Sequence, residues 1–292
     1  MAQKTYLEIF DDLVMQLKRF FREAGYTKAV LGLSGGFDSA LVAAVACEAL
    51  GRDNVLSTYL PMGGISSRES NVLAVQTANA LGCELRVIEI DNVVKSILYA
   101  VDHHFTPIVG LPDVTVENAQ ARARGMILMT LANQEDRLVL ETSNLSESLV
   151  GYCTLYGDTV GAVEVIGCLF KTEAYEVACA YNAAYPQRAI PQAVIDRPPS
   201  AELRVGQVDT SELPPYAVLD PLLYALYFQN MNLHQFVDYA VEQRNIENVM
   251  ADHLYHEIVP LMKRGAFKMK QCPPMLDVRG LPGRPTSVKE SV

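Results

Sequence analysis

The spacing of apolar residues predicts alternating strands and helices along most of the chain. Helical spacing occurs over residues 4–24, from residue 38, from residue 66 and over residues 117–134. Short apolar runs predict strands at residues 29–33, 55–60, 85–90 and 138–140. Strands that alternate with helices through short connections form right-handed crossovers and hence a parallel sheet. We therefore expect an α/β fold, a Rossmann-like doubly wound parallel sheet with flanking helices.

The pattern changes after residue 185. Residues 186–216 are rich in proline and show little periodicity, so we expect a mobile loop that orders when a ligand binds. Helical spacing returns over residues 219–227 and 232–239 and predicts a C-terminal helical extension. We expect a single domain over residues 1–279 and a disordered tail over residues 280–292.

A glycine-containing string, Ser34-Gly-Gly-Phe-Asp-Ser39, joins the first predicted strand to its helix. Paired glycines let the backbone approach a ligand closely, and the free N–H groups at a helix start attract phosphate. The string contains no lysine and lacks the G-x-x-x-x-G-K-[ST] spacing, so it is not a Walker A loop, and it does not match the G-x-G-x-x-G dinucleotide fingerprint either. The hydroxyls of Ser34 and Ser39 would share the anion with backbone amides, and Asp38 is free to hold Mg²⁺.

Composition and charge exclude several function classes. The 292 residues are 50% hydrophobic and 20% charged, an ordinary balance for a globular protein. The net charge of −10 argues against nucleic-acid binding, so an anionic substrate requires local positive charge. We find no signal peptide and no apolar run near the roughly 20 residues that span a bilayer, and we expect a cytoplasmic protein. The six cysteines lack metal-binding spacing and favour reduced, buried thiols.

Several motifs in combination resemble those of NAD synthetases, over roughly residues 5–275. The Ser34–Ser39 string is similar to the SGGxDS loop of the ATP pyrophosphatase superfamily. The resemblance therefore implies that the single domain expected over residues 1–279 is a synthetase domain of the ATP-pyrophosphatase type. The other matching motifs are Asn118-Ala-Gln-Ala-Arg122, Thr142-Ser-Asn-Leu-Ser-Glu147, Gly151-Tyr-Cys-Thr-Leu-Tyr-Gly-Asp158, Lys171-Thr172 and Arg197-Pro-Pro-Ser-Ala-Glu-Leu203.

Two individual residues within or near these motifs indicate the branch of the family. Leu155 and Ala162 resemble the synthetase portion of the glutamine-dependent, two-domain enzymes more than the short ammonia-dependent ones. No glutaminase domain precedes the first predicted helix, so we expect ammonia as the nitrogen donor. Glu141 stands where the family usually has glycine, and Leu145 where it often has lysine. A carboxylate at position 141 is expected to affect nucleotide affinity or the choice of substrate.

The resemblance implies a reaction in two steps. The nicotinate carboxylate of deamido-NAD attacks the α-phosphorus of ATP, which gives an acyl adenylate and pyrophosphate. Ammonia then displaces AMP and forms NAD. Both nucleophiles come from substrates, which fits the absence of a Ser-His-Asp or Cys-His signature. The expected partners are therefore ATP, deamido-NAD and ammonia, with Mg²⁺ as the cofactor, and the family further implies a homodimer that uses the helix carrying Asn118.

The resemblance also implies residue roles. Asp38 and Lys171 are the expected catalytic residues, and Asp38 and Glu147 the expected Mg²⁺ ligands. The expected ATP contacts are Leu33, Ser34, Gly35, Gly36, Asp38, Ser39, Thr142, Lys171 and Ser200. The expected contacts on the deamido-NAD side are Asn118, Arg122, Glu147 and Lys268. The 186–216 segment is the candidate lid that protects the adenylate from water.

Three alternatives stay open at this point. The chain could amidate another adenylated carboxylate, such as nicotinate mononucleotide. It could be a synthetase subunit fed by a separate glutaminase. It could also be a non-catalytic nucleotide-binding sensor, although the presence of Asp38 and Lys171 argues against that role. A tRNA thiolase would need reactive cysteine pairs and a basic face, and the sequence has neither.

Overall fold

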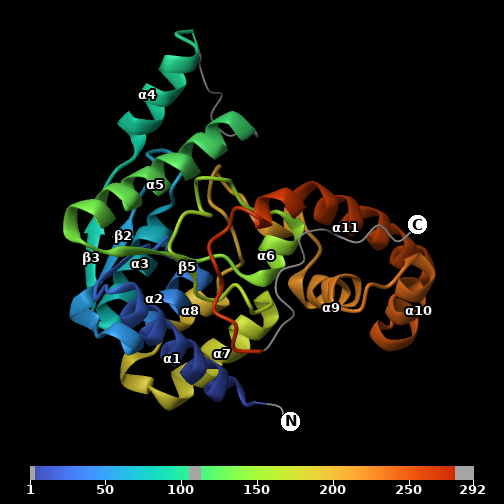
Figure 1. The fold of residues 1–292 in the computed structure, drawn as a ribbon. Helices are drawn as coiled ribbons and strands as arrows, with labels where there is room; N and C mark the ends of the chain where they lie inside the picture. Colours follow the sequence, from blue (N-terminus) through green and yellow to red (C-terminus); the bar gives the residue numbers. More distant parts are fainter. Residues whose placement is uncertain (1–3, 105–112, 280–292) are drawn as a thin grey trace.

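A computed structural model describes residues 4–104 and 113–279, so the tail expected at 280–292 lies outside the described residues (Figure 1). The described residues form a parallel sheet with strand order β3-β2-β1-β4-β5. Its strands are β1 (Ala29–Gly32), β2 (Val55–Tyr59), β3 (Glu84–Val87), β4 (Leu138–Glu141) and β5 (Val163–Glu164). The α/β architecture expected from the hydrophobic pattern is confirmed.

The register brings three carboxyl ends to one edge of the sheet. Ala29 at the start of β1 pairs with Val55 of β2 and with Leu138 of β4. The ladder continues past the end of β1, where the Leu33 amide donates to the Thr58 carbonyl at 2.9 Å. Because ligands bind beyond the carboxyl ends of parallel strands, this edge is the place to look for a site.

Helices cover both faces of the sheet (Figure 1). One face packs against α1 (Tyr6–Ala24), α2 (Phe37–Leu50), α3 (Arg68–Leu81) and α7 (Lys171–Ala184). The other face packs against α4 (Asp91–Val101) and α5 (Val114–Glu135). Helix α2 is apolar all round and almost entirely buried, as expected of a helix between a sheet and other helices.

Helix ends follow local sequence signals. Thr5 and Glu8 form a capping box at the start of α1, and Gly25 ends that helix with φ +77°. The Ser67 hydroxyl accepts from the Ser70 amide at the start of α3, and Gly82 ends α3 with φ +74°. These signals fix the lengths of the helices that surround the sheet.

The C-terminal helices form a core of their own, beside the sheet (Figure 1). They are α9 (Tyr216–Tyr227), α10 (Leu233–Arg244) and α11 (Asn248–Met269), and they pack with α6 (Leu145–Val150). Buried residues from each helix meet there, including Leu149, Leu223, Phe236 and Ile258. This confirms the expected C-terminal helical extension, which is longer than the sequence pattern predicted.

Three local expectations were incomplete. Strand β5 was not predicted, because two residues show no period. Residues 186–216 are not structureless, since they contain α8 (Gln192–Asp196) and 3₁₀ turns at Pro186–Arg188 and Asp209–Ser211. All six cysteines are free, as expected, but the expectation of burial is wrong for Cys179, which is exposed on α7.

Within residues 4–104 and 113–279, no helix has the length and apolarity needed to cross a membrane.

Candidate functional site

A cavity of about 240 Å³ opens at the carboxyl edge of the sheet. Leu33 and Thr58 line it from the ends of β1 and β2, and Thr142 lines it from the end of β4. The segment 197–203 and Asp209 line it from another side. The cavity is therefore built by parts of the chain that are far apart in sequence.

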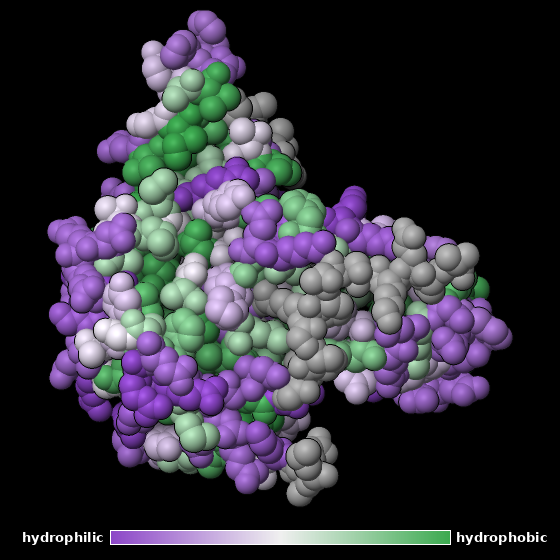
Figure 2. Space-filling view, viewed as in Figure 1, coloured by the Kyte–Doolittle hydropathy of each residue, from purple (hydrophilic) through white to green (hydrophobic). Residues whose placement is uncertain are grey.

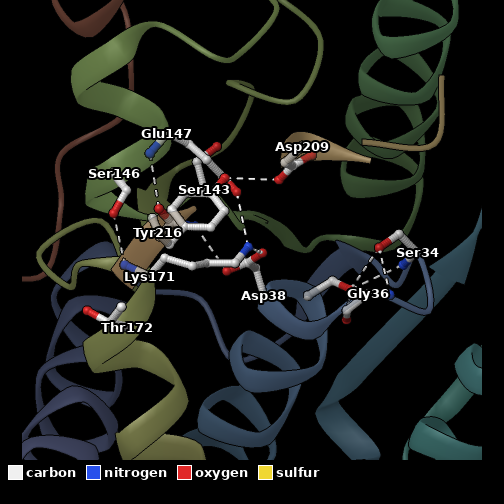
Figure 3. Close-up of polar contacts among 12 residues, drawn as sticks. Ser34, Gly36, Asp38, Ser143, Ser146, Glu147, Lys171, Thr172, Asp209 and Tyr216 are labelled. Carbon is white, nitrogen blue, oxygen red and sulfur yellow. Dashed lines mark hydrogen bonds and ion pairs between the residues drawn. The ribbon is translucent and has the colours of Figure 1, made fainter. Parts of the chain in front are cut away.

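The Ser34–Ser39 loop forms one wall of this cavity (Figure 3). Its two serine hydroxyls lie 3.1 Å apart, and the Gly36 amide donates to the Ser34 hydroxyl at 3.1 Å. Gly35 has φ +82°, and a Cβ there would lie 2.3 Å from the Ser70 carbonyl oxygen of α3. Only glycine fits this position, so the loop can pack directly against the backbone of α3.

Asp38, Glu147 and Lys171 converge beside the loop (Figure 3). The Lys171 ammonium donates to Asp38 Oδ2 at 2.5 Å and to Glu147 Oε1 at 3.2 Å. Lys171 is 2% exposed, and its ammonium lies 5.2 Å from the centre of the Tyr216 ring. The expected catalytic and metal-ligating residues thus share one buried ion cluster.

The charges in this cluster are strongly coupled. Burial alone would lower the pKa of Lys171, but the carboxylates of Asp38 and Glu147 more than offset it and raise that pKa. Burial raises the pKa of Glu147 to about 8, and Lys171 only partly offsets this. Lys171 therefore stays charged and pairs most closely with Asp38, while Glu147 is short of positive charge. A cation placed there would favour its ionised form.

The turn after β4 connects the cluster to the sheet. The side-chain Nδ2 of Asn144 donates to Asp38 Oδ1 at 3.1 Å. The side-chain Oδ1 of Asn144 caps α6 by accepting from the backbone amide of Glu147. Glu141, at the end of β4, is 1% exposed and accepts from the Ser143 amide at 3.1 Å. Burial raises the pKa of Glu141 to about 8. Gly161 makes room for it, since a Cβ at Gly161 would lie 2.9 Å from the Glu141 Cβ.

The candidate lid is docked on the rest of the protein. Glu202 Oε1 accepts from the Ser67 amide at 3.0 Å and from the Ser70 hydroxyl at 2.5 Å, both at the start of α3. The Ser200 hydroxyl lies at the cavity and donates to the Gln207 carbonyl at 2.6 Å. These contacts hold the segment against α3, and its movement on ligand binding stays a prediction.

The three residues expected only on the deamido-NAD side lie elsewhere. Asn118 accepts from the Thr154 hydroxyl at 2.7 Å. Arg122 is exposed on α5 and donates to the Leu155 carbonyl at 3.2 Å. The Lys268 ammonium donates to the carbonyls of Gly151 and Cys153, each at 2.7 Å. All three contact the 151–158 loop, and none of them lines the cavity.

Some cavity residues were not assigned a role from the sequence. Arg124 lines the cavity and donates to the Leu60 carbonyl at 2.9 Å, and burial lowers its pKa to about 10. Asp158 also lines the cavity, and burial raises its pKa to about 6. A signal for Arg124 exists in the sequence. Ala121, Arg124, Gly125 and Leu128 share one helical face, and all four line the cavity.

Comparison with known proteins adds the family. The chain is 37% identical over 270 residues to a glutamine-dependent NAD(+) synthetase of Acinetobacter baylyi, a match that covers 92% of this chain and 48% of that one. The chain spans about half the length of the curated relatives it matches. Among solved structures, an NMN synthetase of Francisella tularensis matches with TM-score 0.73 and 25% identity, covering 91% of this chain and 97% of that one.

An NH3-dependent NAD synthetase of Campylobacter jejuni matches with TM-score 0.67 and 26% identity, covering 94% of this chain and all of that one. The sequence model of the family described as NAD synthase matches residues 9–272. This range includes the glycine loop, the ion cluster and all three helices of the helical extension. The chain therefore belongs to the NAD synthase family.

Proposed function

We propose that the chain catalyses the ATP-dependent amidation of deamido-NAD to NAD, with ammonia as nitrogen donor and with AMP and pyrophosphate as the other products. The observation that carries this proposal is the convergence of Asp38, Glu147 and Lys171 beside the Ser34–Ser39 loop. Acidic and basic groups at a helix start suit the transfer of a nucleotidyl group from ATP.

The cavity residues support the first step of this reaction. The substrate carboxylate forms a bond to the α-phosphorus, and the bond to the β-phosphate oxygen breaks. Charge then develops on the departing pyrophosphate. Amides of the loop around Gly36 and the ammonium of Lys171 would stabilise that charge, and they are already fixed in place by the contacts described above. Ammonia attacks the acyl carbon in the second step, and AMP leaves.

The donor set fits Mg²⁺. Asp38 and Glu147 supply hard carboxylate oxygens, and both reach the same Lys171 ammonium, so they face a common point. The Glu147 side chain is only 15% exposed and its pKa is raised despite the nearby Lys171 ammonium, as expected of a ligand that a cation neutralises. The ion, when bound, would neutralise phosphate charge. Among the protein's own groups, the Lys171 ammonium and the loop amides would also stabilise phosphate charge.

We infer that Arg122 and Lys268 serve the deamido-NAD side through a second copy of the chain. We take the exposed apolar residues of α4 and α5 together as a candidate patch, since α5 also carries Arg122, and Figure 2 shows apolar surface over α4. The patch comprises Ile97, Tyr99, Val101, Val114 and Met126. Such a patch is typical of a protein–protein interface, and we propose a homodimer. Light scattering of the wild type and of Met126→Glu tests this, and a wild-type monomer would contradict it.

We further infer that residues 1–279 act as one synthetase domain. Tyr216 and Asp220 of the helical extension contact Lys171, Ser146 and Thr172 beside the cavity. Separating the extension from the sheet would therefore expose the ion cluster. Because ATP and a dinucleotide are the proposed substrates, we place the reaction in the cytoplasm.

One observation favours a second substrate. The Francisella structure that matches over almost its whole length is an NMN synthetase, so nicotinate mononucleotide is a candidate acid. The nitrogen donor is a separate question. The curated relatives are glutamine-dependent and about twice as long, which allows a glutaminase partner for this chain.

Incubation of the purified chain with ATP and Mg²⁺ decides between these options. Deamido-NAD and nicotinate mononucleotide are supplied in separate reactions, each with ammonium or with glutamine. The measured products are AMP, pyrophosphate and the amide of the acid supplied, which is NAD in the case of deamido-NAD. NAD formed from deamido-NAD and ammonium supports the proposal. Turnover only with nicotinate mononucleotide would replace the substrate, and no AMP with either acid would refute the amidation. Asp38→Asn is the matched control for contaminating activity.

A further inference from the structure

Helix α7 caps only part of its own start. The Glu173 carboxylate in its first turn accepts from the backbone N–H of Phe170 at 3.0 Å, but Phe170, the N-cap residue, has no side-chain acceptor for the next N–H groups, which also need partners. The Lys171 amide donates to the Ser146 hydroxyl at 2.9 Å, and the Thr172 amide donates to Asp220 Oδ2 at 2.8 Å. The partners come from α6 and α9, so the start of α7 is fixed by two other helices.

Asp220 joins these helices with a single carboxylate. Its Oδ1 accepts from the Ser146 hydroxyl at 2.6 Å, and its Oδ2 accepts from the Thr172 hydroxyl at 2.7 Å as well as from the Thr172 amide. Asp220 is 3% exposed and belongs to α9. Both of its oxygens are therefore used, and a negative charge faces the positive end of the α7 dipole.

The two contact residues are neighbours of the ion cluster. Ser146 precedes Glu147 on α6, and Thr172 follows Lys171 on α7. We propose, resting on the function proposed above, that Asp220 is a positioning residue for the nucleotidyl-transfer step: it holds Glu147 and Lys171 at the spacing that the phosphates require. It touches neither of those two side chains and acts through Ser146 and Thr172.

Packing of the extension does not require this carboxylate. Leu219, Leu222 and Leu223 of α9 are fully buried and hold the helix by apolar contact. A buried carboxylate at the same place is unfavourable unless its hydrogen bonds compensate, and burial raises the pKa of Asp220. An apolar residue would serve packing better, so the contacts to Ser146 and Thr172 are the feature that needs a functional reason.

The test compares Asp220→Asn with Leu223→Ala in the full chain. Asparagine keeps the shape and one acceptor but sets an N–H group against a donor. Leu223→Ala removes apolar packing from the same helix without touching Ser146 or Thr172. Each variant is measured for thermal unfolding, for the Kd of MgATP by calorimetry and for pyrophosphate release. Both changes are repeated in a Lys171→Gln background, which makes a double-mutant cycle.

We expect Asp220→Asn to lower pyrophosphate release about 100-fold, because displacement of a positioned group by about 1 Å has an effect of that size. In the Lys171→Gln background the same change should cost less than about 3-fold, since the group to be positioned is gone. Leu223→Ala should lower Tm while keeping the activity of the folded protein.

Equal losses from Asp220→Asn in both backgrounds would show general destabilisation and overturn the inference, as would an unchanged rate in the wild-type background. If the wild type releases no pyrophosphate with any acid, the amidation proposal fails by itself. The MgATP affinities then decide about Asp220, because its effect on Kd must also disappear when Lys171 is absent.

Discussion

Two groups of expected site residues differ in how they are held. Asp38, Glu147 and Lys171, the phosphate end, meet inside the cavity and contact one another. Asn118, Arg122 and Lys268, the substrate end, contact the 151–158 loop and lie outside the cavity lining. The first group is assembled within one chain, whereas the side chains of the second group bind backbone carbonyls, accept from a loop hydroxyl or lie exposed.

The difference follows from where the two groups lie in the fold. The phosphate-end residues lie at the start of α2, on α6 and at the start of α7, close to the edge where β1 and β4 end. Their positions follow from the sheet. The substrate-end residues lie on α5 and α11, and all three contact the 151–158 loop. We therefore expect chemistry to be sensitive to single changes at the first end, and stability or substrate affinity at the second.

The largest effect is expected at Asp38. Replacing it with asparagine removes a proposed Mg²⁺ ligand and the partner of the Lys171 ammonium, so pyrophosphate release should fall about 10²–10³-fold. The measurement is the initial rate at saturating ATP and Mg²⁺. Retention of more than a tenth of the wild-type rate would remove Asp38 from the reacting end of the cavity.

The next effect concerns Glu141, at the end of β4 between the two groups. Its pKa of about 8 in the folded chain lies above the model-peptide value of 4.5, so the folded state binds the extra proton between these values. The contribution of Glu141 to the free energy of unfolding is then highest below about pH 4.5. It falls by up to about 1.4 kcal/mol per pH unit as pH rises toward 8.

Denaturant unfolding of the wild type and of Glu141→Gln at several pH values isolates this contribution, because other buried acids contribute equally to both proteins. The glutamine variant should gain stability relative to the wild type as pH rises from 5 to 8. Parallel pH profiles would mean that Glu141 is ionised in the folded chain at pH 5.

A smaller effect separates the two glycines of the phosphate loop. Gly35→Ala meets the Ser70 carbonyl and a positive φ, so it should destabilise the chain by about 1–3 kcal/mol. Gly36→Ala is the matched control, since its Cβ would lie 3.1 Å from the movable Ser34 hydroxyl. It should cost under about 1 kcal/mol. Thermal unfolding compares them, and equal losses would contradict the tight contact with α3.

The smallest effects test the substrate end itself. Lys268→Met leaves the carbonyls of Gly151 and Cys153 without their donor and should cost about 2 kcal/mol. Arg122→Ala, at an exposed position, should change stability by less than about 0.5 kcal/mol and raise the KM for deamido-NAD. If both changes raise KM and neither lowers stability, Lys268 contacts substrate directly and its loop contacts are incidental.

The sequence predicted what is local. The run from β1 through the Ser34–Ser39 string into α2 carries its own period, glycines and helix start, so its geometry follows from adjacent residues. The parallel α/β sheet also followed from the alternation of strand and helix periods, and the C-terminal helical extension followed from helical spacing, whereas the strand order β3-β2-β1-β4-β5 was not predicted. Resemblance of motifs then indicated Glu147 and Lys171, whose meeting with Asp38 depends on the whole sheet.

The sequence could not indicate what is assembled at long range. Asp220 is an acidic residue inside an apolar helix, and only the packing of α9 against α6 and α7 reveals its partners. The helical period already separates Arg124 from Arg122, but only the packing of α5 against the sheet shows that Arg124 is the one that faces the cavity. Strand β5 has no period and exists because β4 offers it hydrogen bonds.

The contact between α6 and α11 has a consequence for how this chain can vary. A Cβ on Gly151 would lie 2.5 Å from the Gly265 Cα, and a Cβ on Gly265 would lie 2.6 Å from the Gly151 Cα. Each position already has the smallest residue, so a larger residue at one cannot be compensated by a smaller one at the other. Stepwise exchange at this pair is therefore blocked, and any change there must first move a whole helix away from the one that carries Glu147.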